Sequence, residues 1–113
     1  MQLTFPQAAG EQWPVAVVTG VSRRQGIGAA IVRQLAAAGV SVLATGWQAF
    51  DASVDTGIDE AGPASLIREI TSQGGRAAWI AADLSDPAAL QPIFMEAVQR
   101  FGTVSILVNN AAY

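Results

Sequence analysis

Short apolar runs alternate along the chain with segments in which apolar residues recur every three or four positions. The runs, rich in β-branched residues, predict strands buried on both faces of a parallel sheet, over 14–19, 40–45, 76–82 and 104–110. The periodic segments predict three helices, beginning at Ile27, Pro63 and Pro87. In the first of them, Ile27, Ile31 and Leu35 recur every four residues on one face. Because each helix then joins two parallel strands, we predict a doubly wound α/β fold, incomplete at about four strands and three helices.

Two segments fall outside this alternation. We expect 1–12 to be a polar leader and 46–62 to be a loop, longer than the about two to six residues of most strand-to-helix connections. The first residues lack the cationic and apolar regions of a signal peptide, and the apolar runs are too short to cross a bilayer. We therefore expect a single, truncated domain over 1–113 in a cytoplasmic protein.

The composition excludes several kinds of site. The net charge of −3 argues against binding to nucleic acid, which requires a cationic face. There is no Cys and no His, so disulfides, thiolate ligands and imidazole bases are excluded, and we predict no metal site. All six basic residues are Arg, so the chain contains no Lys.

A glycine-containing turn, Gly20 to Gly28, joins the first predicted strand to the first predicted helix. The pyrophosphate of a dinucleotide binds to backbone N–H groups at such a helix N-terminus, where a Cβ would hold it away. In this context the glycines predict a Rossmann-type dinucleotide-binding site; the alternative is a turn without a ligand. The candidate cofactor-binding residues of the turn are Gly20, Ser22, Arg23, Arg24, Gly26, Ile27 and Gly28.

The end of the second predicted strand indicates which dinucleotide is bound. In NAD-preferring proteins an acidic residue at this point binds the ribose hydroxyls. Here the strand is followed by Gly46 and Trp47, and the next acid, Asp51, lies in the long loop. Arg23 and Arg24 could pair with a 2′-phosphate, although they could also be merely solvated. We therefore predict that NADP(H) is more favoured than NAD(H).

Three motifs in the same order resemble those of the short-chain dehydrogenase/reductase family and cover about 15–112. Thr19-Gly20 with Gly26-Ile27-Gly28 resembles the glycine motif of that family. Asp83-Leu84 resembles its adenine contact, and Asn109-Asn110-Ala111-Ala112 resembles its Asn-Asn-Ala-Gly motif beside the cofactor ribose. Singly, Asp83 could be only a polar strand end and the asparagines only a turn. Together, the resemblance implies four further cofactor-binding residues, Asp83, Leu84, Asn110 and Ala111.

The chain departs from the family pattern at three points. Five residues separate Gly20 from Gly26, where the family has three, and the two additional residues fall at Arg23 and Arg24. The last motif ends in Ala112 instead of Gly, and the 46–62 loop is longer than usual. We expect the enlarged turn to reach differently toward the ribose phosphate.

The resemblance implies hydride transfer between a nicotinamide and a carbonyl or alcohol, with reduction of a 3-oxoacyl thioester as one such activity. The family catalyses it with a Ser and a Tyr-x-x-x-Lys motif. This chain has no Lys, and Tyr113 is its last residue. We therefore assign no catalytic residue and expect the chain alone to be inactive. It would be the N-terminal part of an oxidoreductase, which its abrupt end favours, a non-catalytic nucleotide-binding or regulatory module, or half of a split enzyme.

The fourth predicted strand carries an apolar sequence to the edge of the sheet. We expect it to pair with the first strand on one side only, leaving Val104, Ile106, Leu107 and Val108 on an edge without protective charge or proline. The isolated chain should then be marginally stable, aggregate, or require a second polypeptide or a second copy that covers this edge.

Overall fold

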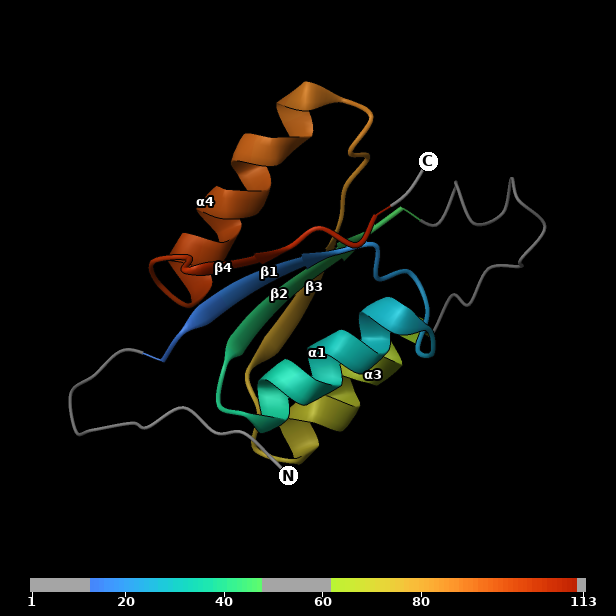
Figure 1. Cartoon of the computed structure of the whole chain (residues 1–113), viewed down its shortest axis with the longest axis vertical. Helices are drawn as coiled ribbons and strands as arrows, with labels where there is room; N and C mark the ends of the chain where they lie inside the picture. Colours follow the sequence, from blue (N-terminus) through green and yellow to red (C-terminus); the bar gives the residue numbers. More distant parts are fainter. Residues whose placement is uncertain (1–12, 48–61, 112–113) are drawn as a thin grey trace.

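The computed structural model describes residues 13–47 and 62–111; the predicted leader 1–12 and most of the predicted loop 46–62 lie outside these residues. The described residues form one parallel sheet in the order β3-β2-β1-β4. Its strands are β1 (Val15–Thr19), β2 (Ser41–Gly46), β3 (Ala77–Ala81) and β4 (Ile106–Val108). The prediction of a doubly wound α/β fold is therefore confirmed (Figure 1).

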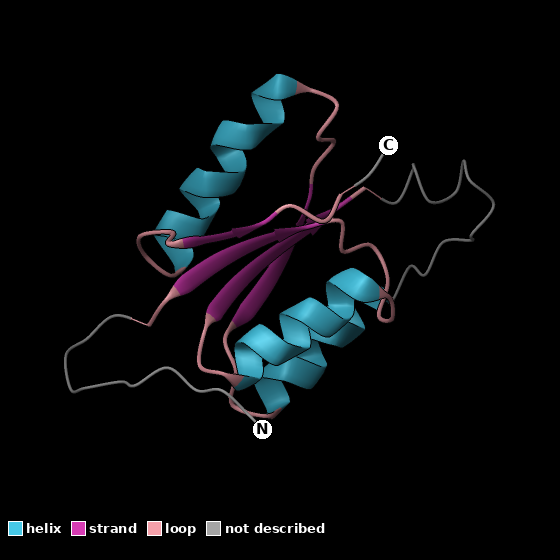
Figure 2. Ribbon diagram, viewed as in Figure 1, coloured by secondary structure: helices cyan, strands magenta, loops and turns pink. Residues whose placement is uncertain are grey.

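The helices lie on both faces of this sheet. α1 (Ile27–Ala37) and α3 (Gly62–Ser72) cover one face, and α4 (Leu90–Arg100) covers the other (Figures 1 and 2). A 3-10 turn, η1 (Pro87–Ala89), leads into α4, and the Asp86 carboxylate caps it by accepting the Ala88 N–H at 3.0 Å. None of the helices in the described ranges has the length and apolar character that crossing a membrane requires.

The central strand, β1, explains why the apolar runs show no alternation. All five of its residues are buried. Ala16 and Val18 belong to the apolar cluster under α1 and α3, whereas Val15 and Val17 belong to the cluster under α4. A strand covered on both faces needs apolar residues at every position, so its sequence reads as a continuous run.

The buried face of α1 is not the one on which Ile27, Ile31 and Leu35 recur. Ala29, Val32 and Ala36 are buried against the sheet, whereas Ile31 and Leu35 are only partly buried and Ile27 is 75% exposed. A face made largely of alanine lets the helix axis approach the sheet closely, and the larger side chains then flank the contact. Ile27 begins the helix beside the glycine turn and borders a pocket there.

β4 is shorter than the predicted run, since only Ile106–Val108 is strand. It pairs with β1, as expected, with Val17 opposite Leu107. Among the described residues no strand pairs with its outer edge, and Leu107 is 57% exposed there. Whether this edge drives self-association remains a prediction.

Candidate cofactor-binding site

A pocket of about 370 Å³ lies where the carboxyl ends of the strands meet the glycine turn and the start of α1. Residues that follow each of the four strands contribute to its lining. Of the predicted cofactor-binding residues, those that line it are Gly20, Ser22, Arg23, Gly26, Ile27, Gly28, Leu84, Asn110 and Ala111. Arg24 and Asp83 do not line it. Trp47, Thr45 and Ala82 also line the pocket, although none of them belongs to the predicted set.

Thr19, the last residue of β1, ties the ends of β1 and β4 together. Its hydroxyl oxygen accepts the N–H of Asn110 at 3.0 Å and the N–H of Ala111 at 3.1 Å. Thr19 is only 5% exposed, so these bonds are shielded from water. They fix the backbone of the Asn110-Ala111 segment at the mouth of the pocket. Thr19 begins the predicted glycine motif, but the sequence pattern indicates no role for its side chain.

Gly20 and Gly28 allow the turn, α1 and the end of β4 to pack together. A Cβ on Gly20 would lie 2.9 Å from the Asn110 side-chain nitrogen, and one on Gly28 would lie 2.7 Å from the Gly20 carbonyl oxygen. The Asn110 amide donates to that same carbonyl oxygen at 3.2 Å. These two glycines are therefore needed for packing within the chain, whether or not a ligand is bound.

Gly26 precedes α1 and leaves the backbone at the N-terminus of this helix uncovered by a side chain. Its φ of 121° lies in the region that favours glycine, and a Cβ there would meet nothing within 4 Å. In the described part of the chain no side chain caps this helix N-terminus, and its first turn carries no acidic residue. Uncapped N–H groups at a helix N-terminus attract anions. This end of the pocket is thus suited to a phosphate.

The first half of the glycine turn is fastened to the sheet through Val21. Its N–H donates to the Thr45 carbonyl at 2.9 Å, and its own carbonyl accepts the indole N–H of Trp79. Gly46 makes this approach possible, because a Cβ there would overlap the Val21 carbonyl oxygen. The sequence indicates only that Gly46 is not acidic. The structure shows that the lack of a side chain at this position is needed for packing.

A second hydrogen bond between the glycine turn and the end of β2 joins Ser22 to Trp47. The Ser22 hydroxyl accepts the backbone N–H of Trp47 at 3.1 Å. The Trp47 residue is 38% exposed and lines the pocket, as does Leu84. Just after β2, where NAD-preferring proteins have an acidic residue, this chain therefore has an aromatic ring at the pocket.

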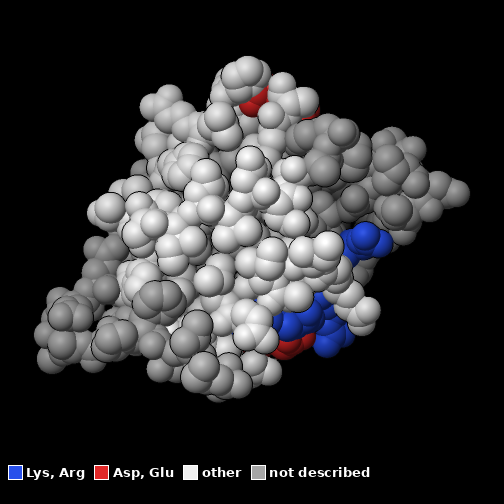
Figure 3. All heavy atoms as spheres, in the orientation of Figure 1, with Lys and Arg blue, Asp and Glu red and all other residues white. Residues whose placement is uncertain are grey.

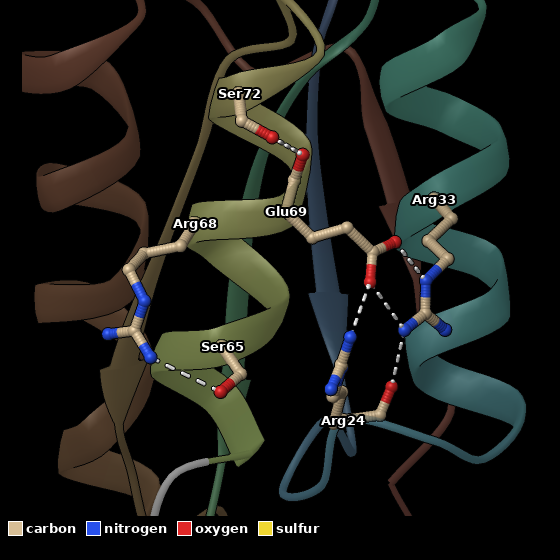
Figure 4. Close-up of polar contacts among 6 residues, drawn as sticks. All are labelled: Arg24, Arg33, Ser65, Arg68, Glu69 and Ser72. Carbon is tan, nitrogen blue, oxygen red and sulfur yellow. Dashed lines mark hydrogen bonds and ion pairs between the residues drawn. The ribbon is translucent and has the colours of Figure 1, made fainter.

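The two arginines of the turn are placed differently. Arg23 is exposed at the pocket, and it has no ion pair or hydrogen bond within the described part of the chain. Arg24 instead lies beside Glu69 of α3, with 3.7 Å between its Nη2 and the Glu69 Oε1 (Figure 4). Most of the surface in Figure 3 is uncharged, and cationic side chains gather at its lower right beside acidic atoms. From the sequence, either arginine could pair with a 2′-phosphate; in the structure only Arg23 lines the pocket.

Arg33 of α1 contacts both Glu69 and Arg24. Its Nε donates to Glu69 at 2.6 Å and its Nη2 donates to Glu69 at 3.2 Å. The same Nη2 donates to the Arg24 carbonyl oxygen at 2.8 Å (Figure 4). The hydrogen bond from Arg33 holds the pKa of Glu69 below its ordinary value, and the same bond raises the pKa of Arg33.

Asp83 turns its carboxylate toward its own loop. Its Oδ1 accepts the backbone N–H of Ser85 at 3.0 Å and the Ser85 hydroxyl at 2.6 Å. The following residue, Leu84, lines the pocket. Of the predicted adenine contact, the structure thus places Leu84 at the pocket and Asp83 beside it.

This arrangement defines a class of protein. The strand order changes direction between β1 and β4, and the pocket opens at the carboxyl ends of these strands, beside a glycine turn and a helix N-terminus. In open α/β sheets this switch point is where dinucleotides bind. The family model for short chain dehydrogenases matches residues 14–113, and the chain belongs to this family.

Individual relatives agree with the family assignment. A Streptomyces violaceoruber protein, named as a putative ketoacyl reductase of the granaticin polyketide synthase, is 39% identical over 98 residues, covering 87% of this chain and 31% of the relative. A solved short-chain dehydrogenase/reductase from Serratia marcescens is 40% identical with a TM-score of 0.71, over 90% of this chain and 37% of that one. A blue fluorescent protein from a metagenomic library, solved with NADPH, is 38% identical with a TM-score of 0.72, over 90% and 37%. The chain spans about a third of the length of the curated relatives it matches.

Proposed function

We propose that this chain forms the NADP(H)-binding part of an oxidoreductase that transfers hydride between a nicotinamide and a carbonyl or alcohol. The observation that carries the proposal is the placement of Arg23. Arg23 lines the pocket and has no hydrogen bond or ion pair within the described residues, while β2 ends at Gly46 and is followed by Trp47, without an acid. A cation without a competing carboxylate favours a ribose that carries a 2′-phosphate.

The residues at the pocket fit a dinucleotide. The pyrophosphate would lie against the open N-terminus of α1 at Gly26, where a Cβ would project into empty space. Leu84 would contact the adenine and Asn110 would lie beside the ribose, as the family motifs imply, and Trp47, which also lines the pocket, would add an aromatic contact to the adenine. When bound, the dinucleotide would supply the hydride; these side chains would only bind and orient it. The relative solved with NADPH supports the choice of cofactor.

The substrate class is proposed from the relative named for ketoacyl reduction. We infer a 3-oxoacyl thioester, or a similar polyketide-type carbonyl compound, as the compound reduced. The chain contains no Lys, so the family's Tyr-x-x-x-Lys motif would have to come from residues outside this sequence, in the same polypeptide or in a second one. Intact-mass spectrometry of the protein made by its source distinguishes these cases: with a species near 11.7 kDa, catalysis would have to come from a second polypeptide or be absent.

The cofactor preference is tested by measuring the dissociation constants of NADPH and NADH by calorimetry. We expect NADPH to bind at least about tenfold more tightly, which corresponds to about 1.4 kcal/mol. Arg23→Gln should remove this difference and leave NADH binding unchanged. Arg68→Gln is the matched control, because Arg68 lies on α3 and points away from the turn, toward Ser65 (Figure 4). Equal affinities in the unaltered protein would refute the preference for NADP(H).

A further inference from the structure

The two halves of the enlarged glycine turn make different contacts with the rest of the chain. The first half, Val21 and Ser22, is hydrogen-bonded to Thr45 and Trp47 at the end of β2 and to the Trp79 side chain in the middle of β3. The second half contains the two residues by which the turn exceeds the family spacing, Arg23 and Arg24. Arg33 of α1 donates to the Arg24 carbonyl oxygen in this half, and Glu69 of α3 forms an ion pair with the Arg24 side chain.

The Arg24–Arg33–Glu69 cluster joins three segments that are distant in sequence. One Arg33 guanidinium binds both oxygens of Glu69 and also donates to the Arg24 carbonyl. The side chains of Arg33 and Glu69 are 32% and 24% exposed, so the pair is partly shielded from solvent, whereas Arg24 is 56% exposed. Two hydrogen bonds between Arg and a carboxylate fix the orientation of both groups more firmly than a single ion pair does.

Glu69 is necessary for this arrangement on electrostatic grounds. Its carboxylate faces two guanidinium groups, those of Arg24 and Arg33, and forms an ion pair with each. Without its charge the two cations would repel one another. Arg33 would then lose the bond that orients its Nη2 toward the Arg24 carbonyl. The expected consequence is local loosening of the turn, because exposed ion pairs contribute little to overall stability.

We propose that Glu69 and Arg33 are positioning residues that hold the second half of the glycine turn, so that Arg23 and Gly26 remain at the mouth of the cofactor pocket. The part of this inference that concerns Arg23 and a 2′-phosphate rests on the proposed function. The part that concerns the turn does not, because Gly26 lies at the helix N-terminus that any dinucleotide would approach.

The test compares Glu69→Gln with Glu96→Gln in the protein as expressed from its complete gene. Glu96 makes a matched ion pair with Arg100 on α4, at 2.7 Å, so its substitution removes the same charge from a helix on the other face of the sheet. The first readout is limited trypsin digestion without dinucleotide, followed by mass spectrometry of cleavage after Arg23 and Arg24. The second readout is the dissociation constant of NADPH and of NADH.

We expect Glu69→Gln to accelerate cleavage after Arg24 by at least about threefold, since proteolysis follows the population of the opened segment. It should also weaken both dinucleotides by about three- to tenfold through the cost of ordering a loosened turn. Arg33→Lys keeps the charge but cannot reach both Glu69 and the Arg24 carbonyl with one planar group, so it should give an intermediate result. Glu96→Gln should change neither quantity.

The outcomes separate this inference from the proposed function. Equal binding of NADPH and NADH by the unaltered protein refutes the cofactor preference, while a loss of both affinities in Glu69→Gln still supports the positioning role. If the unaltered protein binds neither dinucleotide, the proposed function fails and the trypsin readout alone decides the positioning role. Glu69→Gln and Glu96→Gln with the same cleavage rate would overturn it. If Glu69→Gln does not fold, an unaltered cleavage rate in Arg33→Lys overturns it.

Discussion

Gly20 and Asn110 are in such close contact that a Cβ on Gly20 would lie 2.9 Å from the Asn110 side-chain nitrogen. The Asn110 side chain donates to the Gly20 carbonyl at 3.2 Å, which joins the glycine turn after β1 to the segment after β4. Two motifs 90 residues apart in the sequence are therefore parts of one packed unit. This unit forms one wall of the proposed cofactor site.

Replacing Gly20 should disrupt that unit. Gly20→Ala combines a φ of 78° with a steric overlap, so we expect a loss of about 2–4 kcal/mol in the free energy of unfolding. Gly74→Ala is the control, because Gly74 has a φ of 88° but a Cβ there would meet nothing within 4 Å. It should cost only the backbone term, about 1–2 kcal/mol. Urea denaturation measures both, and equal losses would show that the contact with Asn110 is unimportant.

Thr19 and Thr45 are both buried but should respond oppositely to replacement by Val. The Thr19 hydroxyl accepts two backbone N–H groups, so Thr19→Val should cost about 1–3 kcal/mol by leaving them unpaired. The Thr45 hydroxyl is fully buried and has no hydrogen-bond partner among the described residues. Thr45→Val should therefore be neutral or stabilising. The two free energies of unfolding, measured in urea, test this contrast; equal losses would contradict it.

The contribution of Glu69 to stability should depend on pH. Arg33 lowers the pKa of Glu69 below its ordinary 4.5 in the folded chain, so the stabilisation is present above that value. It is lost as the pH falls through the lowered pKa, when the carboxylate of the folded chain is protonated. The difference in unfolding free energy between the unaltered protein and Glu69→Gln should thus be constant from neutral pH to about 5 and shrink below 4.5. A difference that grew on acidification would contradict the assignment.

Trp47 should contribute to the affinity for the dinucleotide. The Trp47 residue is 38% exposed and lines the pocket, and stacking of a base on an aromatic side chain is worth about 1–3 kcal/mol. We expect Trp47→Leu to weaken NADPH binding at least about fivefold. Trp13→Leu is the control, since Trp13 lies against Arg76, with 4.0 Å between the guanidinium carbon and the ring centre. Calorimetric titration of both variants decides whether the effect is specific to Trp47.

The outer edge of β4 should promote association of the 113-residue chain. Leu107 is 57% exposed on that edge, and no strand pairs with it among the described residues. Leu107→Lys should reduce association measured by sedimentation velocity, because an edge lysine opposes pairing with another strand. Met95→Lys adds the same charge on α4, where Met95 is 51% exposed, and should have a smaller effect. Equal effects would indicate that net charge alone governs association.

The amino-acid sequence by itself determined the order of strands and helices, the parallel sheet and the place of the glycine turn. These follow from periodicity, β-branched runs and glycine spacing, which are local properties of the chain. The family resemblance came from short motifs of the same kind, and the match of the family model to 14–113 confirms it. Element ends were less well determined: β4 comprises only Ile106–Val108 of the predicted 104–110.

Only the tertiary structure decided how individual side chains of the site are used. Arg23 and Arg24 are adjacent and chemically identical. Arg24 forms an ion pair with Glu69 of α3 and does not line the pocket, whereas Arg23 does. Gly46 is required because the turn after β1 packs on it, and Thr19 is required because the segment after β4 hydrogen-bonds to it. Such roles depend on contacts between residues far apart in sequence, and no local pattern encodes which distant groups folding brings together.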